Sequence, residues 1–428
     1  MFETFRNAFK IPDLRKKMLY TLFVIVLFRI GAAIPVPFLD PVGLKNIMTS
    51  TSGGLMGLID TLTGDAFSKA SLFAMSVTPY INASIIIQLL AVAIPALERL
   101  MKEGEVGRKR VAQITRYTTL GLGLLQGLAY YFFLRNQGVV SYTDGFSGVW
   151  AAIVIITCFT AGATLMMWLG EQINENGVGN GISILLFAGI VSRMPAIIGK
   201  LARYWNMDMT KYYILVPVIA ILTVVAIAAV CFMNSAERRI PIQYAKRMVG
   251  RKLYGGQSTF MPVKVLASGV MPIIFAVSIV SIPQTICMWV SPTSGFYQFF
   301  TKWFSSSGPV YAIVYFFLII VFNFFYVGIQ YNPFEMANNL KKNNGGIPGI
   351  RPGKPTSDYI KHCLSRVTFI GAIFLGIIAI LPIIIAQATT MQIELGGTTL
   401  LILVGVALDT TRQLESQMMM RHYKGFLD

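Results

Sequence analysis

The chain has 428 residues, of which 55% are hydrophobic and only 13% are charged, and its mean hydropathy is +0.63. Soluble domains carry about 25% charged residues, so this composition excludes a soluble globular protein and indicates one that crosses a membrane several times. We attribute the net charge of +17 first to membrane topology, because loops on the cytosolic side of membrane proteins are rich in lysine and arginine. The charge alone therefore does not indicate a nucleic-acid-binding protein.

Ten apolar segments are candidates for membrane-spanning helices, because about 20 residues of helix cross the ~30 Å hydrocarbon layer. Two of them contain one arginine each, Arg29 within Met18–Pro37 and Arg193 within Gly181–Ile198. The tenth, Leu395–Leu408, is short but is required by the charge distribution. The others carry no charge and cover residues 72–97, 117–134, 145–170, 212–236, 265–301, 303–334 and 367–393.

Ten spans place both termini on the same side of the membrane. Most of the 36 lysines and arginines fall in the N-terminus, the C-terminus and the loops after spans 2, 6 and 8, so this side is predicted to be the cytosol. Five spans fall in each half of the chain, 1–205 and 206–428, and an odd number inserts the two halves with opposite orientation. The predicted fold class is an all-α membrane protein of ten transmembrane helices in two inverted five-helix halves.

A short apolar fragment, GGLMGLIDTLTG, lies between the first and second spans at Gly53–Gly64. As a helix, Leu55–Leu62 would extend only ~12 Å, so it can enter the membrane and return but cannot cross it. Such a re-entrant segment needs a protein-lined or water-filled cavity around it. The alternative is an amphipathic helix that lies on the outer leaflet. Arg29 has two interpretations as well, snorkelling to the outer interface or pairing with a polar neighbour.

The second span is unusually polar for a membrane helix. Pro79 is expected to interrupt the helix in mid-run. Polar side chains in such a helix face helical neighbours or water, so this span is predicted to line a pathway that opens. The polar residues are Ser76, Thr78, Asn82, Ser84 and Gln88.

Two long loops are predicted on the cytosolic side. Residues 237–264 alternate basic and apolar residues around Tyr254, Gly255 and Gly256, which is typical of a hairpin. Residues 332–366 begin with a helical pattern and continue with glycine and proline. Loops of this kind are suited to contacting a partner.

Catalytic and cofactor chemistry is missing from the sequence. The two histidines, His362 and His422, lie in cytosolic segments, and the run GIRPGKPT does not have the spacing of a phosphate-binding loop. The four cysteines contain no CxxC pair, so neither a metal nor a disulfide framework is expected. We therefore predict neither an enzyme nor a cofactor.

Five stretches resemble the SecY family of channel-forming subunits of the bacterial protein-export translocon, and the similarity runs from about residue 14 to about residue 420. They are LRKKMLYTLFVIVLFRIGAAIPVP (14–37), ASLFAMSVTPYINASIIIQLL (70–90), MWLGEQINENGVGNGISILLFAGIV (167–191), QSTFMPVKVLASGVMPIIFA (257–276) and NPFEMANNLKKNNGGIPGIRPG (332–353). The resemblance implies a central pore with an apolar ring at its waist, a plug that closes it, and a lateral gate between spans 2 and 7.

The resemblance also assigns residues to these parts, although two isoleucines of the family's ring are replaced here by Val77 and Leu186. The ring would be Val77, Ile81, Ile182, Leu186, Ile274 and Ile402. The plug would be Gly53, Gly54, Leu55, Met56, Gly57, Leu58, Ile59, Asp60, Thr61, Leu62, Thr63 and Gly64. The lateral gate would include Asn82, Ile85 and Gln284, although Gln284 has a simpler reading as a polar group that meets water at the end of its span.

The expected function is a passive channel for unfolded polypeptides that also releases apolar segments sideways into lipid. The implied partners are SecE, SecG, the SecA motor, the ribosome and, through the cytosolic loops, ribosomal RNA, in the bacterial plasma membrane. The motor and ribosome contacts would be Arg238, Arg239, Lys246, Arg247, Arg251, Lys252, Arg351 and Lys354, unless these residues only set the topology. The competing functions are a small-solute secondary transporter and an assembly scaffold without a pore.

Overall fold

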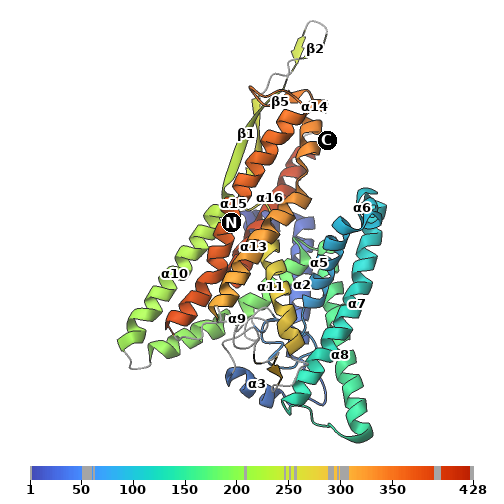
Figure 1. The fold of residues 1–428 in the computed structure, drawn as a ribbon, viewed down its shortest axis with the longest axis vertical. Helices are drawn as coiled ribbons and strands as arrows, with labels where there is room; N and C mark the ends of the chain where they lie inside the picture. The colour runs from blue at the N-terminus through green and yellow to red at the C-terminus, as the bar shows by residue number, and fades with distance from the viewer. Residues whose placement is uncertain are drawn as a thin grey trace.

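The computed structural model is a long helical bundle with a small β-structure at one end (Figure 1). It describes residues 2–50, 60, 63–206, 210–244, 247–249, 252–254, 258–287, 294–295, 298, 308–389 and 397–424. The β-hairpin, α14 and the C-terminus lie at one end of the bundle, and α3 lies at the other (Figure 1). The first end corresponds to the predicted cytosolic side.

Ten helices among the described residues correspond in order to the ten predicted spans. In the N-terminal half they are α2 (Pro12–Ala33), α5 (Thr78–Ala93), α7 (Glu105–Asn136), α8 (Gly145–Asn176) and α9 (Gly181–Trp205). In the C-terminal half they are α10 (Thr210–Ser235), α11 (Met271–Cys287), α13 (Pro309–Gln330), α15 (Lys354–Thr389) and α16 (Gly397–Lys424). The short helices are α1 (Phe2–Lys10), α3 (Pro41–Ser50), α6 (Pro95–Lys102) and α14 (Pro333–Lys342).

Length and hydropathy alone identify fewer spans than this. Among the described residues, five helices are long and apolar enough to cross a membrane, or six if α5 and α6 count as one bent span. The expected spans α2, α7, α11 and α16 are not among them. Charged residues in α2, glycines and Gln126 within the apolar stretch of α7, a short apolar stretch in α11 and the polar second half of α16 explain the difference.

The second span differs from its prediction, because Pro79 does not interrupt a helix. Residues 72–77 form turns, and α5 begins at Thr78 with Pro79 in its first turn. A proline has no backbone N–H to donate, so it is well tolerated at this position, where the N–H would have no helical acceptor. The other end of the span does break at a proline: Ile94 is extended before Pro95, and α6 leaves at 109°.

The turns at 72–77 pack closely against α8. A Cβ atom added to Gly162 would lie only 1.9 Å from the carbonyl oxygen of Leu72, so only glycine allows this approach. Nearby, the Tyr130 hydroxyl of α7 donates to the carbonyl of Phe67 at 2.8 Å. The loop between the first and second spans is thus packed into the N-terminal half from residue 63 onward.

The two cytosolic loops form one unit. Strands β1 (Glu237–Tyr244) and β4 (Ser258–Lys264) pair antiparallel, and β5 (Gly345–Gly346) of the second loop adds to β1. Strands β2 (Arg247–Val249) and β3 (Lys252–Tyr254) extend the hairpin, and its innermost pair is Val249 opposite Lys252. The hairpin prediction is confirmed by these pairings, and Gly255 and Gly256 lie outside the described residues.

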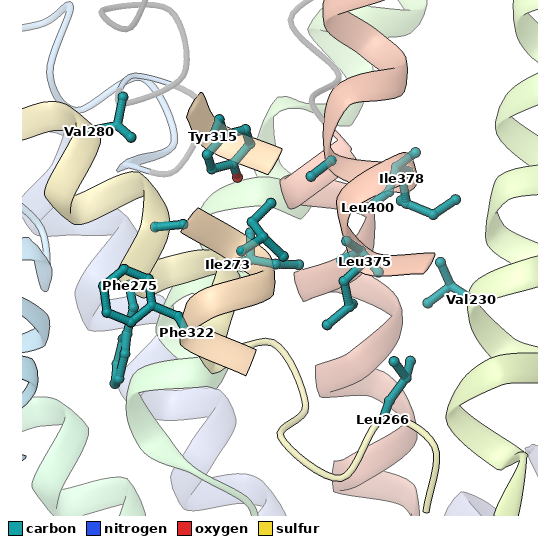
Figure 2. Close-up of a cluster of buried hydrophobic side chains, with 14 of the residues drawn as sticks. Val230, Leu266, Ile273, Phe275, Val280, Tyr315, Phe322, Leu375, Ile378 and Leu400 are labelled. Atoms are coloured by element: carbon teal, nitrogen blue, oxygen red, sulfur yellow. The ribbon is translucent and has the colours of Figure 1, made fainter. Parts of the chain in front are cut away.

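Two large apolar clusters come largely from one half of the chain each, and a third packs residues of α7 and α8 against the loop after α2. The C-terminal cluster surrounds α11, with Ile273 and Phe275 facing Phe322 of α13 and Leu375 of α15 (Figure 2). The N-terminal cluster contains residues of α2, α5, α8 and α9. Each of these two large clusters also receives residues from the other half, and three half-buried side chains pack against both: Ile81, Val270 and Leu403.

Candidate functional site

Five of the six predicted ring residues meet in the N-terminal cluster. Val77, Leu186 and Ile402 are buried in it, and Val77 is only 1% exposed. Val77 directly precedes α5, Leu186 lies on α9 and Ile402 lies on α16. Ile81 and Ile182 are half-buried and pack against the same cluster. Because Ile402 lies on α16, both halves of the chain contribute to this apolar contact, which we call the waist.

The sixth residue, Ile274, is not among the side chains of the N-terminal cluster, although it lies one helical turn after Val270, which packs against that cluster. It is half-buried on α11 and, among the described residues, belongs to neither of the two large clusters. Its neighbours Ile273 and Phe275 point into the C-terminal cluster (Figure 2). Consecutive residues of a helix lie about 100° apart, so Ile274 faces another direction.

The helices of the predicted lateral gate, α5 and α11, lie against each other. Ile85 of α5 is buried within the C-terminal cluster beside residues of α11. Asn82 is half-buried, and its Oδ1 atom is buried without a hydrogen-bond partner among the described residues. Gln284 lies on α11, but its side chain is outside the described part of the chain. The seam is therefore apolar at Ile85 and has an unused acceptor at Asn82.

Most of the predicted plug lies outside the described residues, which include only Asp60, Thr63 and Gly64 of it. These three are buried. The Nη1 atom of Arg29 donates to the carbonyl oxygen of Gly64 at 3.3 Å. Of the two interpretations of Arg29, pairing with a polar neighbour is the one that the structure shows.

A buried group of charges stands beside Gly64, and the sequence interpretation missed it. Arg193 of α9 pairs with Asp60 through Nη1 at 3.1 Å and with Asp65 through Nε at 2.7 Å. The side chains of Arg193 and Asp60 are 8% and 9% exposed. Removing one partner of such a buried pair leaves an uncompensated charge and costs about 3–5 kcal/mol. A lone arginine in an otherwise uncharged span was the available signal, because such residues are commonly paired and functional.

The basic residues of the cytosolic hairpin are solvent-facing where they are described. Arg238 and Arg239 are exposed on β1, and Arg239 forms an exposed ion pair with Glu237 at 2.8 Å. Arg247 and Lys252 are placed by their backbones on β2 and β3. Lys246 and Arg251 lie outside the described residues.

Arg351 is exposed on a loop that is itself firmly held. Its carbonyl oxygen accepts a hydrogen bond from the hydroxyl of the buried Thr356 at 2.8 Å. Ile347, just before it, packs in a cytosolic cluster with Ile240 of β1 and Leu340 of α14. Lys354 is exposed at the first position of α15. These contacts fix the backbone of the loop, so the exposed side chain of Arg351 projects from a defined position on the cytosolic surface.

The geometry defines a class of protein: a polytopic helical membrane protein whose two sets of helices meet at an apolar waist. The sequence profile of the SecY family matches residues 71–411. A protein translocase subunit SecY from Streptomyces coelicolor is 41% identical over 438 residues, covering 100% of both chains. The chain belongs to the SecY family, and it is accordingly a non-enzymatic translocase subunit with the ten-helix architecture of that family.

Two solved structures share the fold at lower identity. One, described by the finding that the plug domain of the SecY protein stabilises the closed state of the translocation channel and maintains a membrane seal, is 18% identical with a TM-score of 0.64. The other is Sec61 in the canine ribosome–channel complex from the endoplasmic reticulum, 18% identical with a TM-score of 0.61. Each alignment covers 94% of this chain and 92% of the other.

Proposed function

We propose that the waist is the constriction of a polypeptide channel and that Val77, Ile81, Ile182, Leu186 and Ile402 form its ring. The observation that carries this proposal is the meeting of these apolar side chains from both halves of the chain in one cluster. Membership of the translocase family supports it, and a small-solute transporter or a scaffold without a pore is not favoured by any observation.

An apolar constriction suits this function for a physical reason. A narrow apolar passage excludes hydrated ions by dewetting, and it has no fixed ligands that would select one substrate. Side chains such as valine, isoleucine and leucine can close around an extended chain of any sequence. Val77 and Leu186 in place of the family's isoleucines preserve this property. In this interpretation the packed waist is the closed state of the channel.

The seam between α5 and α11 is the proposed exit for apolar segments. Ile85 closes it by apolar contact, and this contact is replaceable by lipid or by a sufficiently apolar substrate helix. Hydrogen bonds between membrane helices are weak, about 0.6 kcal/mol on average. The buried Oδ1 of Asn82 is an acceptor that α11 or a passing polypeptide can use.

The exposed basic surface is the proposed docking site for cytosolic partners. Because the hairpin and the Arg351 loop share one cytosolic cluster, a force on either loop reaches β4 and thus the chain that leads into α11. We propose SecA and the ribosome, including its RNA, as partners on this surface, and SecE and SecG within the membrane. The proposed location is the bacterial plasma membrane with both termini in the cytosol.

The segment before Asp60 is the proposed moving part of the plug. Deleting residues 53–59, or replacing them with a glycine–serine linker of equal length, should raise the resting ion conductance in planar bilayers. A loss of about 1.4 kcal/mol or more from the closed state corresponds to a tenfold or larger rise in the open fraction. Conductance equal to that of the unaltered channel, at equal protein abundance in the membrane, would show that this segment does not seal the pore.

A further inference from the structure

Asp60 and residues 63–71 are linked by local hydrogen bonds into a compact loop, which we call the anchor loop. A carboxylate oxygen of Asp60 accepts from the backbone N–H of Ser68 at 2.8 Å, and its carbonyl oxygen accepts from the N–H of Asp65 at 3.1 Å. The Thr63 hydroxyl donates to the same carbonyl at 3.1 Å and accepts from the N–H of Phe67 at 3.3 Å. Most of the described residues of the anchor loop are buried, so the loop is a fixed part of the N-terminal half.

Two arginines from two different spans bind the anchor loop at its turn, which is formed by Gly64 and Asp65. Gly64 and Asp65 both have left-handed backbone angles, with φ of 66° and 68°, and the turn they make brings the carboxylates of Asp60 and Asp65 to one guanidinium, that of Arg193. Arg29 of α2 donates to the carbonyl of Gly64 on the same turn. A Cβ atom at Gly64 would lie 2.7 Å from Arg29 Nη1, so this turn has no room for a side chain.

The charges of this group balance, and their balance argues against separation. The guanidinium of Arg193 pairs with the carboxylates of Asp60 and Asp65, Arg29 adds a second positive charge at Gly64, and moving Asp60 away would leave Arg193 without its most buried partner. The anchor loop would also lose the hydrogen bond from the backbone N–H of Ser68 to the carboxylate of Asp60. Opening the pore by carrying Asp60 out of this place is therefore unfavourable.

We propose that Arg193, assisted by Arg29, is a positioning residue that anchors the C-terminal end of the plug at Asp60 and Asp65 in both the closed and the open channel. Only the chain before Asp60 then moves, and its fixed point lies beside Arg29 of α2 and Arg193 of α9. This inference rests on the proposed function of residues 53–59 as a plug. It shortens the moving segment relative to the Gly53–Gly64 fragment, because Asp60 and Gly64 belong to the anchor.

The first test compares Arg193→Gln with the matched control Arg203→Gln, an exposed arginine on the same helix. Loss of the anchor frees the C-terminal end of the plug and lowers the effective concentration of residues 53–59 at their seat, so Arg193→Gln should raise the resting conductance about tenfold. Arg203→Gln should leave it unchanged. If Arg193→Gln inserts normally and conducts no more than the unaltered channel, the anchor is wrong. If it does not accumulate, the double variant Asp60→Asn/Arg193→Gln, which leaves no unpaired partner, is measured by the same criterion.

The second test separates a permanent anchor from a latch that must break. In a chain whose four native cysteines are replaced by alanine, the variant Asp60→Cys/Arg193→Cys loses the ion pair and should leak. A bifunctional methanethiosulfonate with a spacer about as long as an arginine side chain then joins the two positions. An anchor predicts that crosslinking restores the seal and that secretory chains still cross the channel. Transport that is blocked by the crosslink and returns on reduction would overturn the proposal in favour of a latch.

Deletion of residues 53–59 in the same bilayer assay distinguishes failure of the proposed anchor from failure of the proposed plug. If that deletion raises the conductance and Arg193→Gln does not, the plug stands and the anchor fails. If the deletion itself has no effect, the plug fails, whatever Arg193→Gln does.

Discussion

Replacing Leu186 and Ile402 together by serine is expected to raise the resting ion conductance about a hundredfold in the channel that lacks residues 53–59. Each change removes the transfer free energy of a large apolar side chain, about 1.5–3 kcal/mol, and each 1.4 kcal/mol corresponds to a factor of ten. The deletion background is used because the proposed plug and ring would act as two barriers in series, and the plug alone could hide the effect. Conductance is measured in planar bilayers, together with the amount of protein in the membrane.

An isosteric pair of variants separates wetting of the ring from loss of packing. Val77 and Val24 are both buried in the same cluster, 1% and 2% exposed, but only Val77 is assigned to the ring. Valine and threonine have nearly the same shape, so Val77→Thr should increase the conductance and Val24→Thr should not. An equal increase in the two variants would mean that the leak reports general damage to the cluster and not the wetting of a pore.

The variant Arg351→Glu is expected to reduce SecA-driven export by at least about tenfold while the protein still inserts into the membrane. Charge pairs at protein interfaces couple with about 1.5–7 kcal/mol, and reversing one charge also adds repulsion. The loop that carries Arg351 is held by its own backbone contact with Thr356, so the substitution leaves the fold intact. Export is measured in proteoliposomes with the purified motor and ATP.

Lys361→Glu is the matched control for Arg351→Glu, because Lys361 is exposed on the first turns of α15 and was not assigned to the docking surface. It makes the same change of charge on the same cytosolic unit and should leave export nearly unchanged. A similar loss in the two variants would assign the effect to the overall positive charge. Normal export by Arg351→Glu would remove Arg351 from the proposed docking site.

The sequence was sufficient for the features that depend on transfer between water and lipid. Uncharged stretches identified most of the spans, and the distribution of basic residues predicted the tenth, which the structure contains as α16. The ring and gate residues came from the resemblance alone, because an isoleucine in a membrane helix has no pattern that distinguishes a pore from ordinary packing. Among them Ile274, half-buried on α11, is not one of the side chains of the waist cluster and stays a prediction.

Features that depend on contacts between distant segments were missed for a different physical reason. Hydropathy does not report which polar groups meet, so the pairing of Arg193 with Asp60 and Asp65 was invisible. The addition of β5 to β1 joins two separate loops through two glycines, which have no strand signal of their own. Pro79 was read as a kink because a proline within an apolar run is ambiguous between interrupting a helix and starting one.

The most direct measurement traps a secretory chain in transit, with a folded domain at its end to stall it, in channels that carry a photo-crosslinking amino acid at one position. Positions 81 and 402 test the waist from the two halves of the chain, and position 221 on the outer surface of α10 is the control, since Ile221 is 64% exposed. A polypeptide that passes through the waist forms adducts at 81 and 402 and none at 221. Adducts at 221 with none at 81 and 402 would show that the polypeptide takes another path.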